Sequence, residues 1–313
     1  MKTDLEQLER IKSFLKQTAT KEVQTVEQTR KTMEEAVDRL PKLPGVHFES
    51  VWMGHCGGEQ VYVGENTEGS TEKGILYFHG GGFTTGSSSI YRDLAARISQ
   101  TSGITVVTVD YRLAPEHTYP AANEDCLNAY RWMRQLGYSA SNLVLGGDSI
   151  GASLVLMTLI TLRDAGEELP AGAFLLSPHT DLVNLDGDSY VSRADLDPSG
   201  SLAGNRKILE DYLGDYAAEI PALLSPLRLG LRGLPSMLIQ AGDQEVLLSD
   251  ATRFTESAHA AGVEVKLEVW ENMWSVFQLM AALLPEARQA IANIGAFVRS
   301  SLNLPVEITY EKK

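Results

Sequence analysis

The chain has 313 residues, of which 43% are apolar, so it can bury a sizeable core within one large α/β domain. Its 27 basic and 41 acidic residues give a formal net charge of −14 without an evident basic patch, which argues against nucleic acid as a partner. The start of the chain lacks the apolar stretch of a secretory signal, and no window approaches about 18 uninterrupted apolar residues. We therefore expect a cytoplasmic protein without a membrane span.

Two amphipathic helices are predicted ahead of the first strand, over residues 4–18 and 22–40. Each places apolar residues on one face: Leu5, Leu8, Ile11 and Leu15 in the first, and Val23, Val26, Met33, Val37 and Leu40 in the second. Two interpretations stay open: a surface for docking or dimerisation, and a lid over an active site. We assign residues 1–45 to an N-terminal helical cap segment, because Leu43-Pro44-Gly45 ends the helical pattern.

From residue 46 onward, strand-like and helical patterns alternate. Strands are predicted at 46–54, 59–64, 74–79, 104–110, 142–146, 171–176, 236–241 and 263–270, and helices at 88–101, 121–136, 149–164, 248–261 and 277–301. Such alternation, with core strands that are nearly all apolar, is typical of a parallel sheet covered by helices on both faces. We predict an α/β fold of this kind, entered by two antiparallel strands.

Residues 181–234 interrupt the alternation. Polar residues, glycine and proline surround a short helix predicted near 206–213. An insertion of this size between two core strands usually folds over the carboxyl ends of a parallel sheet, where ligands bind. We interpret 181–234 as a cap insertion, and the flanking ranges 46–180 and 235–313 as the main domain.

The sequence GDSIG at 147–151 lies between a predicted apolar strand and an apolar helix. Gly147 and Gly151 flank Ser149 at two residues on each side, as a sharp strand-to-helix turn requires, and such a turn exposes the serine hydroxyl above the sheet. The following helix directs the positive end of its dipole at negative charge forming on a substrate. This context predicts that Ser149 is a nucleophile, with Asp148 in a supporting position.

A glycine-rich loop, HGGGF at 79–83, follows another predicted strand. Its glycines let backbone N–H groups approach a carbonyl oxygen without interference from side chains, so Gly81, Gly82 and the N–H of Ile150 are predicted to form an oxyanion hole. A phosphate-binding loop is disfavoured because no lysine followed by serine or threonine completes it. His79 is expected to organise this loop through its ring nitrogens rather than to act as a base.

With these motifs the chain resembles the bacterial branch of the hormone-sensitive lipase family, which are esterases with the α/β-hydrolase fold. The resemblance covers about 74–298 and rests on HGGGF, on VDYRLAPEH at 109–117 with PAA at 120–122, on GDSIG, and on WSVFQ at 274–278. It implies an α/β-hydrolase catalytic domain over 46–180 and 235–313. The family usually has alanine and glycine where this chain has Ile150 and Ala152, which alters the expected shape of the acyl pocket.

The resemblance also implies the position of the triad acid. Family members place it about thirty residues before the histidine and two before a leucine, which selects Glu245 in the loop GDQEVLLSD at 242–250. Asp243 stays open as the alternative or as a supporting residue. Either carboxylate would orient an imidazole and stabilise its cation without taking a proton itself.

The position that matches the family's histidine holds Ser275. A serine hydroxyl has no basic form near neutral pH and is too short to bridge the acid and the nucleophile, so Ser149 lacks its general base. None of the remaining histidines outside the HGGGF loop falls at the end of the last strand: His47, His55, His117, His179 and His259. We interpret Ser275 as a deliberate His→Ser replacement, made to hold an ester without turning it over, which leaves the chain nearly inactive. The alternative is a natural loss that gives a ligand-binding pseudoenzyme.

Two functional hypotheses follow. The first is a serine carboxylesterase for small, short-chain esters, present here in an inactivated form. The second is a non-catalytic receptor or binder of small molecules, similar to the plant gibberellin receptor, which belongs to this family and lost its histidine. The resemblance makes a homodimer plausible, although no residue in particular supports it.

No cofactor or metal is expected. The acidic stretch between Asp181 and Asp197 lacks the spacing of a calcium loop, and the chain has neither HExxH nor paired cysteines. Cys56 and Cys126 stand in unrelated contexts and are expected to be free thiols.

Overall fold

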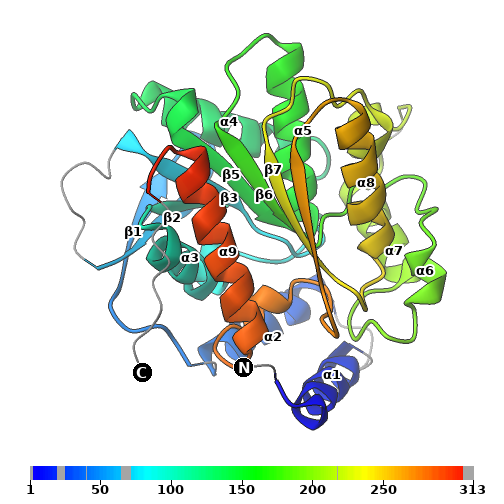
Figure 1. Cartoon of the computed structure of the whole chain (residues 1–313). Helices are drawn as coiled ribbons and strands as arrows, with labels where there is room; N and C mark the ends of the chain where they lie inside the picture. The colour runs from blue at the N-terminus through cyan, green and yellow to red at the C-terminus, as the bar shows by residue number, and fades with distance from the viewer. Residues whose placement is uncertain (1–2, 20–24, 40, 65–71, 217, 306–313) are drawn as a thin grey trace.

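The computed structural model describes residues 3–19, 25–39, 41–64, 72–216 and 218–305 (Figure 1). Its centre is an eight-stranded sheet in the order β1-β2-β4-β3-β5-β6-β7-β8. The strands are β1 (Val46–Trp52), β2 (Gly57–Val63), β3 (Gly74–Phe78), β4 (Val106–Asp110), β5 (Leu143–Asp148), β6 (Gly172–Leu176), β7 (Met237–Gly242) and β8 (Val265–Trp270). Strand β2 pairs antiparallel with both of its neighbours, and all other pairs are parallel. The predicted mostly parallel sheet with an antiparallel entry is confirmed.

Helices cover both faces of the sheet. They are α1 (Leu5–Ala19), α2 (Val26–Asp38), α3 (Ser88–Ser102), α4 (Ala121–Gln135), α5 (Ile150–Asp164), α6 (Ser189–Ser192), α7 (Leu202–Leu213), α8 (Leu248–Ala260) and α9 (Pro285–Ser301). Helices α3 and α9 pack on one face and α4, α5 and α8 on the other (Figure 1). Neighbouring residues of β3 divide between the two cores, Ile75 with the first face and Leu76 with the second, because successive side chains of a strand point to opposite sides.

The predicted final helix over 277–301 is wrong at its start. A short 3₁₀ helix covers Phe277–Met280, and α9 begins only at Pro285 after an extended Leu284. Proline removes a helical N–H and disfavours the helical conformation of the residue before it, so it fits the first turn of a helix and not the interior. The Leu284-Pro285 dipeptide was therefore the signal that could have placed this boundary.

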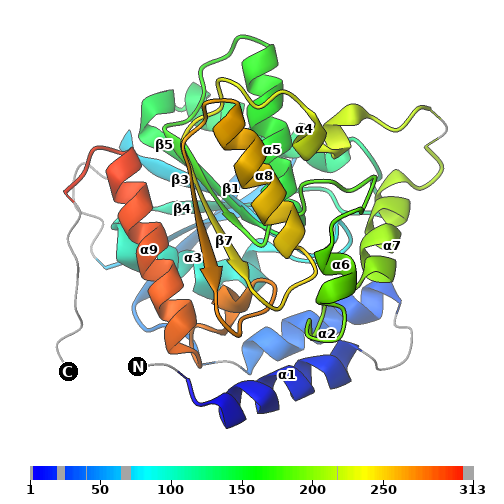
Figure 2. The same ribbon diagram turned by 45° about the vertical axis from the view of Figure 1, so that its right-hand side comes forward.

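The N-terminal helices lie against the main domain near the carboxyl ends of β7 and β8, close to α6 and α7 of the insertion (Figure 2). Leu8 of α1 is 3% exposed, and Met33 and Val37 of α2 pack against the same core as α3 and α9. Lys16 of α1 also donates to the backbone carbonyl of Asp195 in the insertion at 2.6 Å. The apolar face of α1 is covered within the chain from Leu8 onward, but Leu5, also predicted on that face, is 64% exposed. The predicted face residues Val23 and Leu40 lie outside the described residues.

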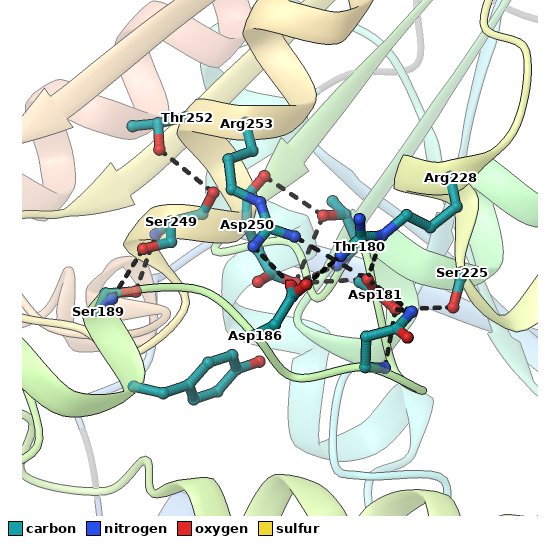
Figure 3. A network of polar contacts seen from close by, with 12 residues as sticks. Thr180, Asp181, Asp186, Ser189, Ser225, Arg228, Ser249, Asp250, Thr252 and Arg253 are labelled. Atoms are coloured by element: carbon teal, nitrogen blue, oxygen red, sulfur yellow. Dashed lines mark hydrogen bonds and ion pairs between the residues drawn. The ribbon is translucent and has the colours of Figure 1, made fainter.

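The insertion is held to the main domain by a network of charged side chains (Figure 3). Asp181 accepts from Arg228 at 2.8 Å, and Asp186 accepts from Arg228 at 2.5 Å and from Arg253 of α8 at 2.7 Å. The buried Asp250 also accepts the N–H of Asp181, at 3.2 Å. The acidic residues at the start of the insertion therefore pair with arginines, and within the described residues no cluster has the composition of a metal site.

Candidate active site

The strand-to-helix turn from β5 to α5 has the strained geometry expected of a nucleophile elbow. Ser149 adopts φ 50° and ψ −119°, a conformation that side chains other than glycine rarely tolerate. A Cβ on Gly147 would lie 2.6 Å from the backbone of Gly151, and a Cβ on Gly151 would lie 2.0 Å from the carbonyl oxygen of Phe78. Both flanking glycines are therefore required, and Ser149 stays half-buried on top of the turn.

The loop after β3 presents its backbone beside this turn. Gly81 and Gly82 adopt φ 109° and 63°, and a Cβ on Gly81 would lie 2.3 Å from the carbonyl oxygen of Thr85. The carbonyl of Gly81 accepts the N–H of Thr85 at 2.9 Å, and this hydrogen bond stabilises the turn formed by the glycine-rich loop. Ile150 is the first residue of α5, so its N–H belongs to the groups that a helix leaves without an intrahelical partner.

Asp148 ties the two backbone segments together. Its carboxylate accepts the N–H of Gly80 at 2.9 Å and the hydroxyls of Tyr77 at 2.8 Å and Tyr91 at 2.9 Å. Burial raises the pKa of Asp148 to about 6, and these hydrogen bonds oppose the rise. Gly80 belongs to the glycine-rich loop, and Asp148 directly precedes Ser149. The Asp148 carboxylate therefore holds this loop against the turn that carries Ser149.

His79 is buried, and no hydrogen bond joins its ring to Ser149 among the described residues. Its Nδ1 donates to the carbonyl of Gly80 at 2.8 Å, and its ring stacks on Tyr111 with centroids 4.3 Å apart. The ring is 1% exposed, and burial lowers its pKa, so it is neutral near pH 7. The organising role of His79 stays a prediction, and the hydrogen bond to Gly80 is the contact through which it would act.

The two candidate acids have different surroundings although they are two residues apart. Glu245 is fully buried, and its Oε2 accepts from Ser177 Oγ and from the N–H of Gly242, each at 2.8 Å. Its other oxygen, Oε1, is buried and has no hydrogen-bond partner among the described residues. Asp243 is half-buried; its Oδ1 is likewise buried without a hydrogen-bond partner among the described residues, but its carboxylate makes no hydrogen bond to the serine turn or to Ser177. The geometry therefore favours Glu245 as the carboxylate of this site.

The loop that carries Ser275 packs directly on the acid loop. The carbonyl of Met273 accepts the N–H of Gln244 at 3.0 Å, and the N–H of Val276 donates to Ser177 Oγ at 2.9 Å. Ser275 is half-exposed, and within the described part of the chain its hydroxyl makes no hydrogen bond. Residue 275 is thus one residue from a contact with the hydroxyl that also binds Glu245.

Ser177 is a residue that the sequence reasoning missed. It directly follows β6, is fully buried, and joins Glu245 to Val276 through one hydroxyl that donates to the first and accepts from the second. The carbonyl of the preceding residue, Leu176, accepts the N–H of Ser149 at 2.8 Å. The end of β6 therefore positions the serine turn, the acid and the loop at 275 together.

The N-terminal helices contact both functional loops, which the sequence did not reveal. Arg30 of α2 donates to the carbonyl of Thr84 at 2.7 Å, and its guanidinium forms a bidentate pair with Glu116 at 2.7 and 2.9 Å. Lys12 of α1 is 6% exposed and donates to the side chain of Gln244, next to Glu245, at 2.7 Å. Of the two interpretations left open, these contacts favour a cap over a free docking surface.

The insertion also reaches the glycine-rich loop. A Cβ on Gly82 would lie 3.1 Å from Ile208 of α7, and Phe83 stacks on Tyr212 of the same helix with centroids 3.6 Å apart. Helix α7 begins at Leu202, four residues before the predicted start, because Ser201 caps it by accepting the N–H of Gly204. An aliphatic side chain therefore lies over the predicted oxyanion hole.

Among the other histidines, His179 contacts the serine turn through its backbone. Its N–H donates to the carbonyl of Ser149 at 3.4 Å, but its ring nitrogen Nε2 is bonded to the hydroxyl of Tyr190 at 3.2 Å. Burial lowers the pKa of His179 to about 4. The ring is therefore a weak base held by the insertion, which does not make it a replacement for a histidine at 275.

The environment of Glu245 predicts a dependence of stability on pH. Burial raises the pKa of Glu245 to about 8. The folded state therefore binds this proton more tightly than the unfolded chain does, and the resulting contribution to the unfolding free energy is complete below about pH 4.5 and is lost as the pH rises toward 8. Glutamine stays neutral throughout, so Glu245→Gln is expected to gain in unfolding free energy relative to the parent chain between pH 5 and pH 8. Urea unfolding at these pH values measures the change in unfolding free energy, and Glu256→Gln, at an exposed position, is the control. A difference in unfolding free energy between Glu245→Gln and the parent chain that does not vary with pH would contradict the raised pKa of Glu245.

Three comparisons with known proteins agree with one another. A family model described as alpha/beta hydrolase fold matches residues 75–279. The chain is 38% identical to an acetyl-hydrolase of Streptomyces hygroscopicus over 86% of its own length and 87% of the relative's, and 33% identical to an esterase of Acinetobacter venetianus over 83% and 84%. Its structure is similar to that of an esterase from the bacterial hormone-sensitive lipase family, with a TM-score of 0.90 at 37% identity, covering 96% and 99% of the two chains. Within the described residues, no helix is long and apolar enough to cross a membrane.

Proposed function

Since this chain belongs to the hormone-sensitive lipase family of α/β hydrolases, we propose that it is a serine carboxylesterase for small, short-chain esters that lacks its general base. The observation that carries the proposal is the strained Ser149, with φ 50°, held beside the glycine-rich loop through Asp148. A scaffold that keeps this strain and this loop is built for acyl transfer.

In the proposed mechanism, Ser149 Oγ attacks the ester carbonyl carbon, and the N–H groups of Gly81, Gly82 and Ile150 bind the oxygen that becomes negative. Backbone donors of this kind contribute because they are already oriented before charge develops. The alcohol then leaves, and water hydrolyses the acyl-enzyme on Ser149.

Each of these steps moves a proton, and the family's histidine position is where the proton acceptor belongs. In this chain Ser275 cannot accept it, so acylation and deacylation are both slow. Glu245 would orient an imidazole at this position through the unpaired Oε1. We propose that the chain is therefore nearly inactive while its binding groups remain in place.

The proposed substrate class follows from the cap. Helices α1 and α2 contact both functional loops, and Ile208 of α7 lies over Gly82. A covered site with an aliphatic side chain above the oxyanion groups favours compact, uncharged esters. The acetyl-hydrolase name of a relative 38% identical to this chain supports the same proposal.

A second candidate function is a receptor that binds a small acid or ester without turnover. The observation that favours it is Ser275 itself, because a capped pocket without a general base retains ligands better than it converts them. Tight binding of one ligand together with inertness of the Ser275→His variant would support this candidate over the esterase.

Chain-length preference tests the proposed substrate class. In the Ser275→His background, p-nitrophenyl acetate and butyrate are expected to be hydrolysed with a higher kcat/KM than the decanoate. Truncation of the covering side chain, Ile208→Ala, is expected to raise the decanoate rate relative to butyrate several-fold, since each methylene in an apolar pocket changes discrimination by about 1–3 kcal/mol. The matched control is Ile220→Ala, an exposed aliphatic residue of the insertion region. A preference for decanoate before truncation would contradict a compact pocket.

A further inference from the structure

Glu245 presents a buried acceptor with no donor opposite it. Its Oε2 is satisfied by Ser177 and by Gly242, whereas Oε1 has no partner among the described residues, in a side chain that is 0% exposed. Leaving such an acceptor unpaired in the interior is unfavourable, and more so when the group is charged. A donor N–H placed against Oε1 would remove this penalty.

The geometry limits where that donor can come from. Ser177 occupies one side of the carboxylate, and its hydroxyl also accepts the N–H of Val276, so Ser275 is one residue from a hydroxyl that is bonded to Glu245. Serine and histidine share their Cβ, and the serine side chain ends one atom later, where a histidine would continue into a ring. Ser275 is only partly buried, so the position keeps some contact with solvent.

A ligand that fits between Glu245 and Ser149 needs two features. It needs an N–H to donate to Oε1, and it needs an unprotonated nitrogen to face the Ser149 hydroxyl. Both groups must belong to a small rigid ring, because the space left by Ser275 is the space that a histidine side chain at this position would fill. Neutral imidazole has this pair of groups on opposite sides of its ring.

We propose that the unpaired Oε1 of Glu245, the short side chain of Ser275 and the hydroxyl of Ser149 form a binding site for a diffusible imidazole-type base, which restores esterase turnover. This inference rests on the proposed function, because it uses the same nucleophile. It adds that the chain is a conditional enzyme whose general base can be supplied from solution.

The reaction balances without any further reactant than ester, water and the base. As Ser149 Oγ bonds to the carbonyl carbon, the free ring nitrogen takes its proton, and the imidazolium pairs with the Glu245 carboxylate. The proton passes to the alcohol oxygen as the ester C–O bond breaks. Water then attacks the acyl group, the ring takes a proton from it, and that proton returns to Ser149 as the acid leaves.

The test measures hydrolysis of p-nitrophenyl butyrate by the chain as it stands, against imidazole concentration near pH 8.5, where Glu245, with a pKa of about 8, is mostly ionised and imidazole is unprotonated. The expected result is a saturable rise in rate of about 10-fold to 10³-fold, below what a tethered histidine achieves, because the free base must first bind. Direct hydrolysis by imidazole is measured with Ser149→Ala and subtracted. A rise that is linear in imidazole and equal in Ser149→Ala would overturn the proposal.

Two matched controls separate a bound base from general buffer catalysis. The first is 1-methylimidazole, which has a similar basicity but no N–H for Oε1, so its rate enhancement is expected to be at least about tenfold smaller. The second is Glu245→Gln, whose near-unchanged size keeps the fold while removing the charged acceptor; circular dichroism verifies folding. Equal enhancement by the two bases, or enhancement undiminished in Glu245→Gln, would overturn the site.

The Ser275→His variant makes failure interpretable. If Ser275→His hydrolyses the ester and imidazole fails to activate the parent chain, the proposed function stands and the base site is wrong. If Ser275→His is folded and inert, the proposed function itself is wrong. Imidazole is expected to leave the rate of Ser275→His unchanged, because the tethered ring already occupies the position, and a further saturable rise there would place the bound base elsewhere and overturn the site.

Discussion

The Ser275→His variant is expected to hydrolyse p-nitrophenyl acetate and butyrate with a kcat about 10⁴–10⁶-fold above that of the chain as it stands. The reason is that one missing group disables the whole set: Ser149, the glycine-rich loop and Glu245 keep their geometry, yet no side chain accepts the proton of the nucleophile. Because the pocket walls are unchanged, KM is expected to move far less than kcat. Steady-state kinetics at pH 7.5 measures both.

Two controls define this result. Adding Ser149→Ala to Ser275→His is expected to return the rate to the level of the parent chain, because the new histidine then has no serine hydroxyl to deprotonate. A conservative Ser275→Ala change is expected to leave the parent rate unaltered, because neither side chain is a base. A gain of less than about tenfold in a correctly folded Ser275→His variant would count against the esterase and for the small-molecule receptor.

The second large effect separates the two candidate acids. In the Ser275→His background, Glu245→Gln is expected to lower kcat about 10⁴-fold, as losing the charge that orients an imidazole does in other triads. Asp243→Asn is expected to lower it less than about tenfold, because Asp243 is half-buried and makes no hydrogen bond to Ser177. Both changes replace a carboxylate with an amide of similar size, so each is the control for the other.

The pH profile gives this comparison an independent readout. The Ser275→His variant is expected to lose activity as the pH falls through the pKa of the new histidine, and Glu245→Gln is expected to shift this loss to lower pH, because an imidazolium without a carboxylate partner is less stable. A larger loss of kcat in Asp243→Asn than in Glu245→Gln would reassign the acid to Asp243.

The fold was predictable because its signals are local. Nearly all-apolar strands alternating with helices indicate a buried parallel sheet, and the observed strands lie within a few residues of the predicted ones. The turn at Ser149 was equally readable, since Gly147 and Gly151 stand where a Cβ would collide with backbone. The start of the last helix was misplaced because periodicity was given more weight than Pro285.

The partners of these motifs were not predictable in the same way. Ser177 is an unremarkable serine in the sequence, and it becomes the link between Glu245 and the loop at 275 only because β6 ends between them. Lys12 and Arg30 read as ordinary charges on amphipathic helices, and their contacts with Gln244 and Thr84 join residues far apart in the chain. No spacing rule reports such contacts.

By itself, the sequence determined the class of fold, the nucleophile turn, the glycine-rich loop and the serine at 275, because backbone sterics and side-chain chemistry act over a few neighbouring residues. Only the tertiary structure decided that Glu245 is fully buried and bonded to Ser177, while Asp243, two residues away, is half-buried and makes no bond to that serine. The physical reason is that burial and hydrogen bonding depend on which distant strands and helices pack around a side chain.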